Sequence, residues 1–377
     1  MSVSAPLARS AFSLEPGLVY LNHAAVGVLP AETRDALTAF VADHARRGVL
    51  GILPVEAHLP AFRARIGAFI GARGEEIAFL RNTGDGANVV ARGLDWAPGD
   101  EIVLSANEFG SNALPWLALR ELGVVIRFVD APRERLTPRT LRAALTPRTR
   151  VVAVSWVSFA DGYRHDLPAL AEVAHEAGAW FCVDAIQGLG AFPLDVRACG
   201  IDALYAGGAK WLMALQGVGL LYVAPALLER LTVRWRGWKD VADIWDFLNY
   251  EQPLAGGAAR FEGGTQNFIG ILSLDRSTAL LAAAGLPAIA AHVLALTDRL
   301  VEGLRRIGCE IATPRGPGIS SGIVTFVRPG SDSVALGRRL GDAGFVTTFR
   351  PSGVRVSPHG YNTCDEIDAF VAAVRAQ

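Results

Sequence analysis

The sequence predicts an α/β fold, with a large domain built on a mainly parallel sheet flanked by helices and a smaller C-terminal α+β domain. Short apolar runs alternate with helical stretches through the first two thirds of the chain, which is the rhythm of βαβ units. One run, VVAVSWV, is almost entirely apolar, as expected of a strand covered by helices on both faces. Helical periodicity returns after an irregular segment. We therefore place the large domain at 17–255 and the small domain at 256–377, together with 1–16.

The elements of the large domain follow in order along the chain. Apolar residues recur at helical spacing over 30–47, where Pro30 suits a first turn. A second helical stretch is expected at 167–177. The sequence predicts strands at 101–105, 124–129, 151–157, 180–184 and 219–223.

The last third begins after a segment without clean periodicity. Residues 234–265 are rich in Trp and Gly and predict a long functional loop or a domain boundary. Beyond them the pattern predicts helices at 288–307 and 333–343 and a strand at 322–327. Thr363 and Glu366 form a capping box that starts a final helix.

Composition narrows the function classes. The 377 residues are 51% hydrophobic and 19% charged, which indicates a globular protein with a large core. A net charge of -1 gives no electrostatic reason to bind nucleic acid or a membrane surface, so we expect neither partner. The N-terminus has no apolar signal segment, and the four cysteines are isolated and lack zinc spacing. We expect reduced thiols, no metal site and a cytoplasmic location.

An acidic residue ends a buried apolar run in AWFCVDAIQGLG. This residue is Asp184, and Gln187 follows it in the next turn. In open α/β sheets the carboxyl ends of strands border the ligand crevice. An aspartate there can pair with a cationic ring nitrogen and make the ring an electron sink. A helix N-cap or turn role explains Asp184 equally well from this segment alone.

Only two of the 36 basic residues are lysines. Lys210 follows a Gly-Gly-Ala turn and precedes apolar residues, so its amine should be partly desolvated, with a lowered pKa that suits a Schiff base. A snorkelling lysine beside a turn is the alternative. Lys239 lies in a charged and aromatic loop, and we expect it to be a solvated surface residue.

A candidate phosphate site lies in FLRNTGDG, residues 79–86. Backbone N–H groups at the start of the helix that follows can bind a phosphate. GDGANV lacks the third glycine of a dinucleotide fingerprint, and GxxxxGK, GxSxG and HExxH are absent from the sequence. The segment therefore predicts a mononucleotide-type phosphate site.

The order of phosphate turn, strand-end acid and lysine resembles that of the fold type I pyridoxal-phosphate enzymes of the class V aminotransferase family. The resemblance covers nearly the whole chain through seven motifs: VYLNHAAVGVLP, FLRNTGDGANVVA, NEFGSNALPW, VDAIQGLG, AGGAKWL, RFEGGTQNFIG and VRVSPHGYNTCDEID. Within the family, the chain looks similar to the isopenicillin N epimerase-like and selenocysteine lyase/cysteine desulfurase-like branch.

The resemblance implies that the cofactor is pyridoxal 5′-phosphate. Lys210 would hold it as an internal aldimine, and Asp184 would pair with its pyridine nitrogen. Gln187 would contact the ring hydroxyl. Phe109 would stack on the ring, with a buried core phenylalanine as the alternative.

The resemblance also implies a phosphate site and a homodimer. Thr83 and Gly84 would hold the phosphate, and Thr265 would reach the phosphate of the partner subunit. The Ser and His that often precede the lysine in this family are here Gly207 and Ala209. Either an arginine of the 234–239 loop replaces these contacts, or cofactor affinity is lower than usual.

For the amino-acid substrate, Arg355 matches the arginine that grips the carboxylate, a task suited to a bidentate guanidinium. Asn22 and His23 match the loop lining the substrate side. Epimerisation needs a second base, for which His23 or Tyr163 are candidates. A second substrate carboxylate would suit Arg164, Arg234 and Arg236.

The reaction that we predict first is transamination at the α-carbon of an amino acid. The alternatives are β-elimination by a carbon–sulfur or carbon–selenium lyase, and epimerisation. Residues 345–355, FVTTFRPSGVR, contain no cysteine, which disfavours a desulfurase that forms a protein persulfide. The non-enzyme alternative is a degenerate scaffold that binds the cofactor without catalysis.

Overall fold

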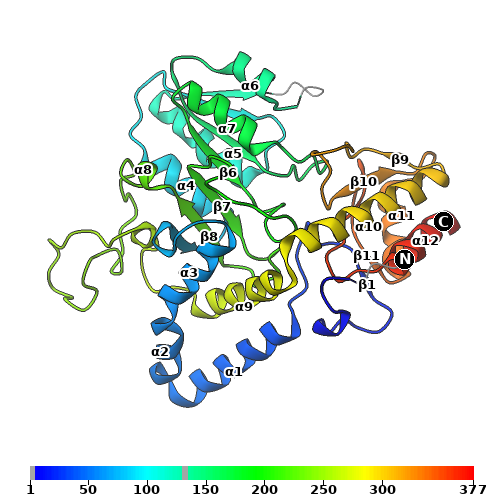
Figure 1. Cartoon of the computed structure of the whole chain (residues 1–377), viewed down its shortest axis with the longest axis horizontal. Coiled ribbons are helices and arrows are strands. Elements are labelled where there is room, and N and C mark those ends of the chain that lie inside the picture. The colour runs from blue at the N-terminus through cyan, green and yellow to red at the C-terminus, as the bar shows by residue number, and fades with distance from the viewer. Residues whose placement is uncertain (1–4, 130–134) are drawn as a thin grey trace.

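The structure is a computed structural model that describes residues 5–129 and 135–377. Its centre is a seven-stranded sheet in the order β2-β8-β7-β6-β5-β3-β4 (Figure 1). The five strands from β7 to β4 run parallel, and β8 lies antiparallel between β7 and β2. The strands are β2 (Ile77–Leu80), β3 (Glu101–Ser105), β4 (Val125–Val129), β5 (Thr149–Ser155), β6 (Trp180–Asp184), β7 (Ala203–Gly207) and β8 (Gly219–Val223).

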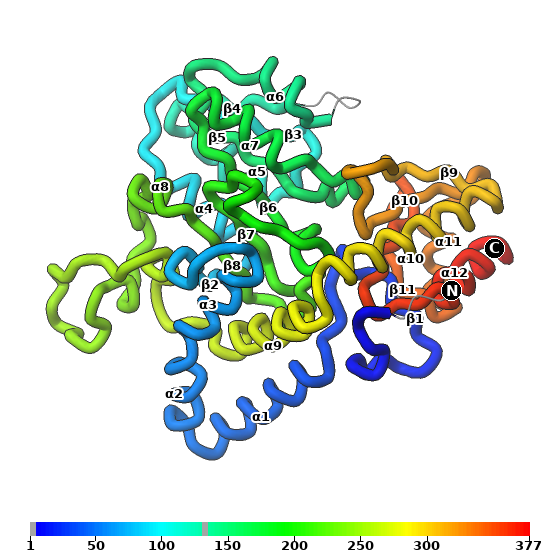
Figure 2. The backbone as a smooth tube through the Cα atoms, in the orientation of Figure 1, coloured from blue at the N-terminus to red at the C-terminus, as the bar shows by residue number. Residues whose placement is uncertain are grey.

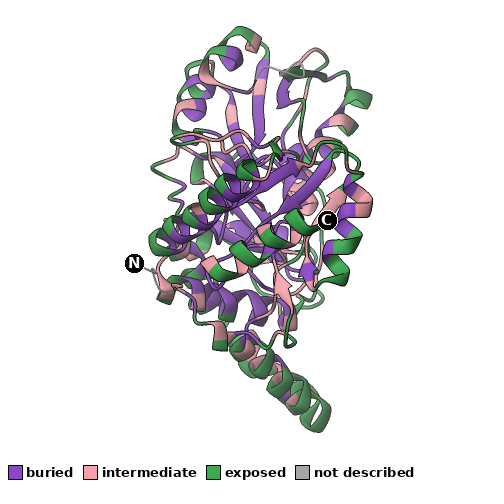
Figure 3. Ribbon diagram, turned by 90° about the vertical axis from the view of Figure 1, so that its right-hand side faces the viewer, coloured by how far each residue is buried: buried purple, intermediate pink, exposed green. Residues whose placement is uncertain are grey.

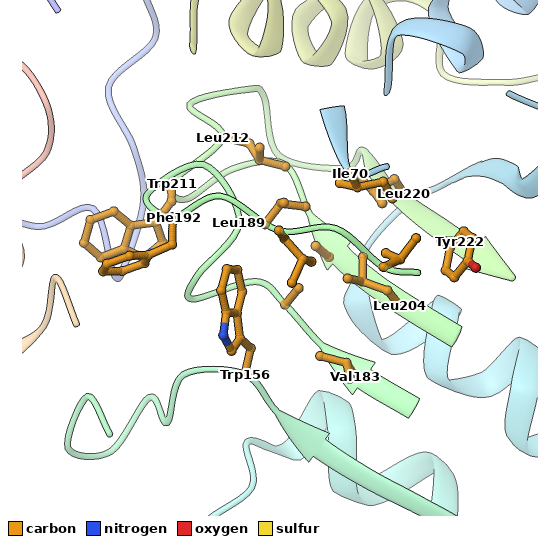
Figure 4. Packing of buried hydrophobic residues seen from close by; sticks show 14 of the residues in the cluster. Ile70, Trp156, Val183, Leu189, Phe192, Leu204, Trp211, Leu212, Leu220 and Tyr222 are labelled. Carbon is orange, nitrogen blue, oxygen red and sulfur yellow. The ribbon is translucent and has the colours of Figure 1, made fainter. Parts of the chain in front are cut away.

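Helices cover both faces of this sheet, so the predicted α/β class is confirmed. One face packs against α4 (Thr83–Gly93) and α5 (Gly110–Leu117), and the other packs against α3 (Leu59–Phe69), α6 (Pro138–Ala144), α7 (Leu167–Glu176) and α9 (Phe268–Ala284). Along β6, Cys182 belongs to the core shared with α4 and α5, whereas Phe181 and Val183 belong to the core on the opposite face of the sheet. Burial on both faces explains why the strands are apolar at consecutive positions. Figure 4 shows part of the core on the face opposite α4 and α5, where Trp156 packs edge-on against Phe192.

The C-terminal part of the chain forms a second, antiparallel sheet. Its strands lie in the order β12-β13-β10-β9 and are β9 (Glu310–Ile311), β10 (Val324–Val327), β12 (Thr348–Arg350) and β13 (Gly353–Val356). The helices around it are α10 (Leu286–Arg306), α11 (Ser333–Asp342) and α12 (Cys364–Ala376). A core that includes Phe326 and Phe370 joins the sheet to these helices.

The N-terminal segment lies beside this C-terminal part. β1 (Val19–Tyr20) pairs in parallel with β11 (Phe345–Val346), so residues far apart in sequence lie side by side (Figure 2). The chain then passes to the large sheet, where α1 (Ala31–Arg47) and α2 (Val49–Ala57) contact α9. β1 therefore lies with small-domain elements although it falls within 17–255, and the domain boundaries themselves stay a prediction.

Most predicted elements are present, with small shifts at their ends. β3, β6 and β8 match the predicted strands residue for residue. β5 ends at Ser155, two residues before the predicted end, because the chain leaves the sheet once the Trp156 N–H has bonded to Asp184 O. Thr363 and Glu366 form the predicted capping box of α12. Figure 3 shows the buried strands and the exposed outer faces of the helices.

The segment 234–265 is irregular, as predicted. Its regular structure is the short 3-10 helix η4 (Ala258–Phe261) and a bridge between Val241 and Leu254. The remaining short helices are α8 (Pro225–Leu228), η1 (Arg9–Ala11), η2 (Gly74–Glu76) and η3 (Ala118–Leu122). Within the described residues, a single helix long and apolar enough to cross a bilayer does not occur; only α9 and α10 together, bent by 80° at their junction, meet both criteria.

Candidate active site

The predicted acid and lysine lie at the carboxyl ends of the parallel strands. Asp184 is the last residue of β6, and its lateral neighbours are Ser155 on β5 and Tyr205 on β7. Lys210 follows three residues after the end of β7. Thr83 opens α4 and accepts a hydrogen bond from Gly207 N at 2.9 Å, which places the predicted phosphate turn against the lysine turn. These segments, separate in sequence, form one site at the sheet edge.

The turn that carries Lys210 is held from several sides. Gly27 N donates to Ala209 O at 2.7 Å, and a Cβ at Gly27 would lie only 2.1 Å from Lys210 O, so the close approach requires glycine. On the other side, Ser277 of α9 donates to Met213 O at 2.8 Å. The lysine backbone is therefore fixed by both the opening loop and α9.

Burial shifts the pKa values of both groups, and for Lys210 the shift is in the direction that its predicted role needs. Desolvation lowers the pKa of Lys210 to about 8; nearby Asp184 opposes this effect and Arg355 adds to it. Desolvation raises the pKa of Asp184 to about 7, although the Ile186 N–H donates to its carboxylate at 2.9 Å. A cationic ring nitrogen beside Asp184 would favour its ionised form.

Phe109 is exposed beside Lys210, so the alternative of a buried core phenylalanine is wrong, and its stacking role stays a prediction. Its side chain is 43% exposed, and the Lys210 Nζ lies 5.5 Å from its ring centroid. Phe159 packs edge-on against it at 5.1 Å. One face of an aromatic ring is thus presented next to the reactive amine.

Gln187 is buried and already has protein partners for both amide heteroatoms. Its Nε2 donates to Ala24 O at 3.0 Å, and its Oε1 accepts from the Trp211 indole at 3.0 Å. One amide hydrogen remains for the predicted contact with a ring hydroxyl. Gln187 also links the opening loop to the lysine turn.

The phosphate turn is built by the start of α4. Asn82 caps the helix by accepting from Asp85 N at 2.9 Å, and Thr83 and Gly84 follow in its first turn. A Cβ at Gly84 would lie 3.8 Å from the Cβ of Ser111, so the start of α5 approaches the same place. Ser111 is therefore a further candidate phosphate donor. The signal for it was a serine just after a glycine at the start of a helix.

Thr265 lies beside α4, whose residues Asp85 and Asn88 line the same pocket. It is exposed, and its hydroxyl accepts from the Trp238 indole at 3.3 Å. It lines a pocket of about 500 Å³ with Arg81 and Trp235, and neither Lys210 nor Asp184 lines this pocket. The contact with a partner's phosphate therefore stays a prediction.

Arg355 of β13, predicted to bind the substrate carboxylate, is linked to Asn22 through Thr348. Only 8% of Arg355 is exposed, its Nη1 donates to Phe159 O at 3.3 Å and its Nη2 donates to Thr348 Oγ1 at 3.4 Å. Thr348 in turn donates to Asn22 Oδ1 at 2.7 Å. The buried Nε of Arg355 has no partner. A buried guanidinium with a free donor suits an incoming carboxylate, and burial lowers its pKa to about 10.

His23 is not placed for proton transfer, and its prediction as a second base needs correction. It is fully buried; its Nδ1 lies 3.1 Å from Ser357 O and its Nε2 lies 3.1 Å from the Tyr361 hydroxyl. This pairing assigns the ring hydrogen to Nδ1 and occupies both nitrogens. The other candidate base, Tyr163, packs edge-on against His165.

Lys239 is buried rather than solvated, so its expected surface role is wrong. Its amine pairs with Glu56, donates to Gln266 Oε1 at 2.9 Å and lies between the rings of Trp238 and Phe268. A loop far from α2 in sequence packs against Glu56, and the local sequence gave no sign of this contact.

The arginines proposed for a second substrate carboxylate are not gathered at Arg355. Arg234 pairs with Asp95, and Arg236 lies 3.9 Å from Asp240. The guanidinium of Arg164 lies over the Phe192 ring. Whether an arginine of the 234–239 loop takes the place of the missing Ser and His contacts stays a prediction.

The donor set fits pyridoxal phosphate. The site combines a desolvated amine, a strand-end acid, an exposed aromatic ring, a helix N-terminus and an unpaired buried guanidinium nitrogen. Lys210 would hold the aldehyde carbon, Asp184 the ring nitrogen, and Thr83 with Gly84 the phosphate. Among the described residues, a cluster of three or more His, Cys, Asp or Glu suited to a metal ion was not found.

Replacing Arg355 with methionine should separate substrate binding from stability. We expect kcat/KM to fall about 100-fold, because loss of one partner of a buried carboxylate–guanidinium pair costs about 2–5 kcal/mol. The melting temperature of the cofactor-free protein should not fall, because the substitution removes a buried charge with an unpaired donor. Steady-state kinetics and thermal unfolding measure the two effects, and a large loss of stability would contradict this assignment.

Comparison with known proteins places this site in a family. The model of the family "Aminotransferase class-V" matches residues 19–370. A probable cysteine desulfurase of Methanothermobacter thermautotrophicus is 30% identical over 93% of this chain and 92% of its own length. A probable cysteine desulfurase of Pseudomonas aeruginosa is 30% identical over 97% and 95%.

Solved structures agree with this placement. The apo structure of a cysteine desulfurase from Thermococcus onnurineus has a TM-score of 0.89 at 26% identity and covers 98% of this chain and 96% of that one. A C-DES structure with glycine covalently linked to its PLP cofactor has a TM-score of 0.88, covering 97% and 98% of the two chains. At 21% identity, this second likeness concerns the fold alone.

Proposed function

Because this chain belongs to the class V aminotransferase family and is a pyridoxal-phosphate-dependent enzyme, we propose that it is a lyase that cleaves the carbon–sulfur bond of a cysteine-like amino acid. Two relatives named probable cysteine desulfurases, each 30% identical over more than nine tenths of the chain, support this reaction. They favour the lyase alternative over transamination, which the sequence alone ranked first.

The hairpin that contains Arg355 supports a further part of this proposal, which concerns the fate of the sulfur. β12 and β13 are joined by two residues, Pro351 and Ser352, and Arg350 pairs with Gly353. The hairpin contains no cysteine and has no loop that could bring one to the substrate. We therefore propose that the sulfur leaves as free sulfide rather than as a persulfide on the protein.

The four cysteines lie elsewhere in the fold. Cys182 and Cys309 are buried in hydrophobic cores, and burial raises the pKa of both thiols. Cys199 packs against the core of the large domain, and Cys364 is the first residue of α12. A protonated thiol in a core is a poor nucleophile, so β-elimination, which needs none, suits this chain better.

Each residue of the candidate site has its own role in the proposed reaction. Bound pyridoxal phosphate supplies an electron sink for the pair left when the Cα–H bond breaks. Arg355 binds the α-carboxylate through its free Nε and orients the substrate. Lys210, whose pKa of about 8 leaves part of it as free amine near neutral pH, takes the α-proton. Asp184 keeps a proton on the pyridine nitrogen, and Phe109 covers one face of the ring.

Product analysis with cysteine tests the proposed reaction. Cysteine and water should yield pyruvate, ammonia and sulfide in equal amounts, as β-elimination requires. Alanine in place of pyruvate would indicate desulfuration, and conversion of the cofactor to its amine form, reversed by a keto acid, would indicate transamination. Either result would overturn the proposal. The variant Cys199→Ala/Cys364→Ala, which removes the two thiols outside the deepest cores, should retain full sulfide release.

We also propose that the enzyme is a homodimer in which Thr265 reaches the partner's cofactor phosphate. Two features support this proposal: Thr265 is exposed, and the pocket that it lines is lined by neither Lys210 nor Asp184 of its own chain. Light scattering gives the molar mass. A mass of one chain, at the concentration used for assay, would reject the dimer.

A further inference from the structure

Glu108 is a partly buried carboxylate beside the active site, and it has no part in the proposed reaction. It lies in the turn between β3 and α5, directly before the stacking residue Phe109. Its Oε1 accepts from Ser155 N at 2.8 Å, and its Oε2 accepts from Ser155 Oγ at 2.5 Å and from Asn112 Nδ2 at 2.8 Å. Burial raises the pKa of Glu108, and the three donors oppose this effect and hold the carboxylate in one position.

The partners of Glu108 lie on both sides of Asp184. Ser155, Asp184 and Tyr205 form one lateral row across β5, β6 and β7, and laterally paired residues of a parallel sheet point to the same face. Glu108 holds Ser155 directly. It holds Tyr205 through Asn112, whose Oδ1 accepts from the Tyr205 hydroxyl at 2.5 Å. The network thus ties together the two strands that flank the acid.

The same carboxylate anchors the turn that presents Phe109. Because 43% of the Phe109 side chain is exposed, its own packing fixes it weakly. Its backbone caps α5, where Phe109 O accepts from Asn112 N at 2.8 Å. Asn112 is fully buried and bonded to Glu108, so the cap and the carboxylate form one rigid unit.

We propose that Glu108 is a positioning residue that fixes Phe109 and Asp184 relative to Lys210 through the network Ser155–Glu108–Asn112–Tyr205. This role does not depend on which bond the enzyme breaks. Any reaction at this site needs Phe109 against one face of the cofactor ring and Asp184 beside the ring nitrogen. It goes beyond the proposed function and stands if that reaction is another one.

Charge supports the geometry. Asp184 is faced by Glu108 from the β3–α5 turn, by Tyr205 from β7 and by Lys210 from the turn after β7. The negative charge of Glu108 raises the pKa of Asp184, and the charge of Lys210 lowers it. Removing the charge of Glu108 should therefore lower the pKa of Asp184.

The variant Glu108→Gln tests the proposal because it keeps the shape and removes the charge. The new amide also turns an N–H toward the Asn112 Nδ2 donor and breaks that contact. In the cofactor-free protein, infrared difference titration should show the Asp184 carboxyl titrating at a lower pH than in the wild type, with Asp184→Asn to assign the band. In the holoenzyme, kcat should fall about 10- to 100-fold, and the visible circular dichroism of the cofactor should weaken.

Two further variants make the result decisive. Glu121→Gln removes an exposed carboxylate of η3 and should leave all three readouts unchanged. Ser155→Ala keeps the charge of Glu108 but removes one donor, and should weaken the dichroism while retaining the Asp184 titration. If Glu108→Gln matches Glu121→Gln in titration, dichroism and kcat, the proposal is wrong. If Glu108→Gln does not fold, unchanged dichroism in Ser155→Ala rejects it.

Discussion

Replacing Lys210 with alanine is expected to lower kcat by roughly 1000-fold or more and to abolish covalent attachment of the cofactor. Lysine is the residue that forms a Schiff base, and the same amine takes the α-proton in the proposed mechanism. Borohydride reduction followed by peptide mass analysis should find the cofactor on Lys210 in the wild type and on no peptide of the variant. A modified peptide in the variant would show that another amine holds the cofactor.

The other lysine of the chain provides the matched control. Lys239→Gln should retain the cofactor on Lys210 but lower the melting temperature, because it breaks the buried pair with Glu56. Lys210→Ala should not lower the melting temperature of the cofactor-free protein near neutral pH, because burial already disfavours the charged amine there. The two variants thus separate loss of chemistry from loss of stability.

Replacing Asp184 with asparagine is expected to lower kcat by on the order of 1000-fold while preserving the fold. The substitution keeps the size of the side chain but removes the charge that would hold a proton on the ring nitrogen. The hydrogen bond from Ile186 N can still be accepted by the amide oxygen. Activity within tenfold of the wild type would exclude Asp184 from this role.

The stability of Asp184→Asn should depend on pH in a defined direction. In the cofactor-free protein the pKa of Asp184 is raised from 3.8 to about 7, so the stability that its protonated form provides is full below about pH 4 and is lost as the pH rises to about 7. The asparagine variant lacks this loss. It should match the wild type near pH 4 and become relatively more stable between pH 4 and pH 7, as thermal unfolding across that range would show.

Individual residues show how far local sequence could reach. Asp184 and Lys210 were found from their own segments, because a polar residue at the end of an apolar strand or turn stands out from its neighbours. Glu108 and Thr348 had no such contrast. Their importance comes from partners far away in sequence, such as Ser155 for Glu108 and Asn22 for Thr348, and a pattern within one segment cannot show such pairs.

His23 and Lys239 show the opposite error. Both were interpreted from residue type and local sequence, which predicted a proton-transfer role for His23 and a solvent-exposed amine for Lys239. In the fold, the Tyr361 hydroxyl and the Ser357 carbonyl occupy the His23 nitrogens, and Glu56 and Gln266 surround the Lys239 amine. Whether a polar side chain is free or paired depends on contacts between segments.

The sequence by itself determined the α/β class and the family and singled out Lys210 and Asp184 as candidates, because strand periodicity and motifs can be read from the chain before it folds. Only the tertiary structure decided which groups meet. It brought β13 and the opening loop together at Arg355, left the Arg355 Nε without a partner, and closed β12 and β13 with two residues. Such contacts form when burial of the apolar faces fixes the elements against one another, and burial also sets the pKa values on which the chemistry depends.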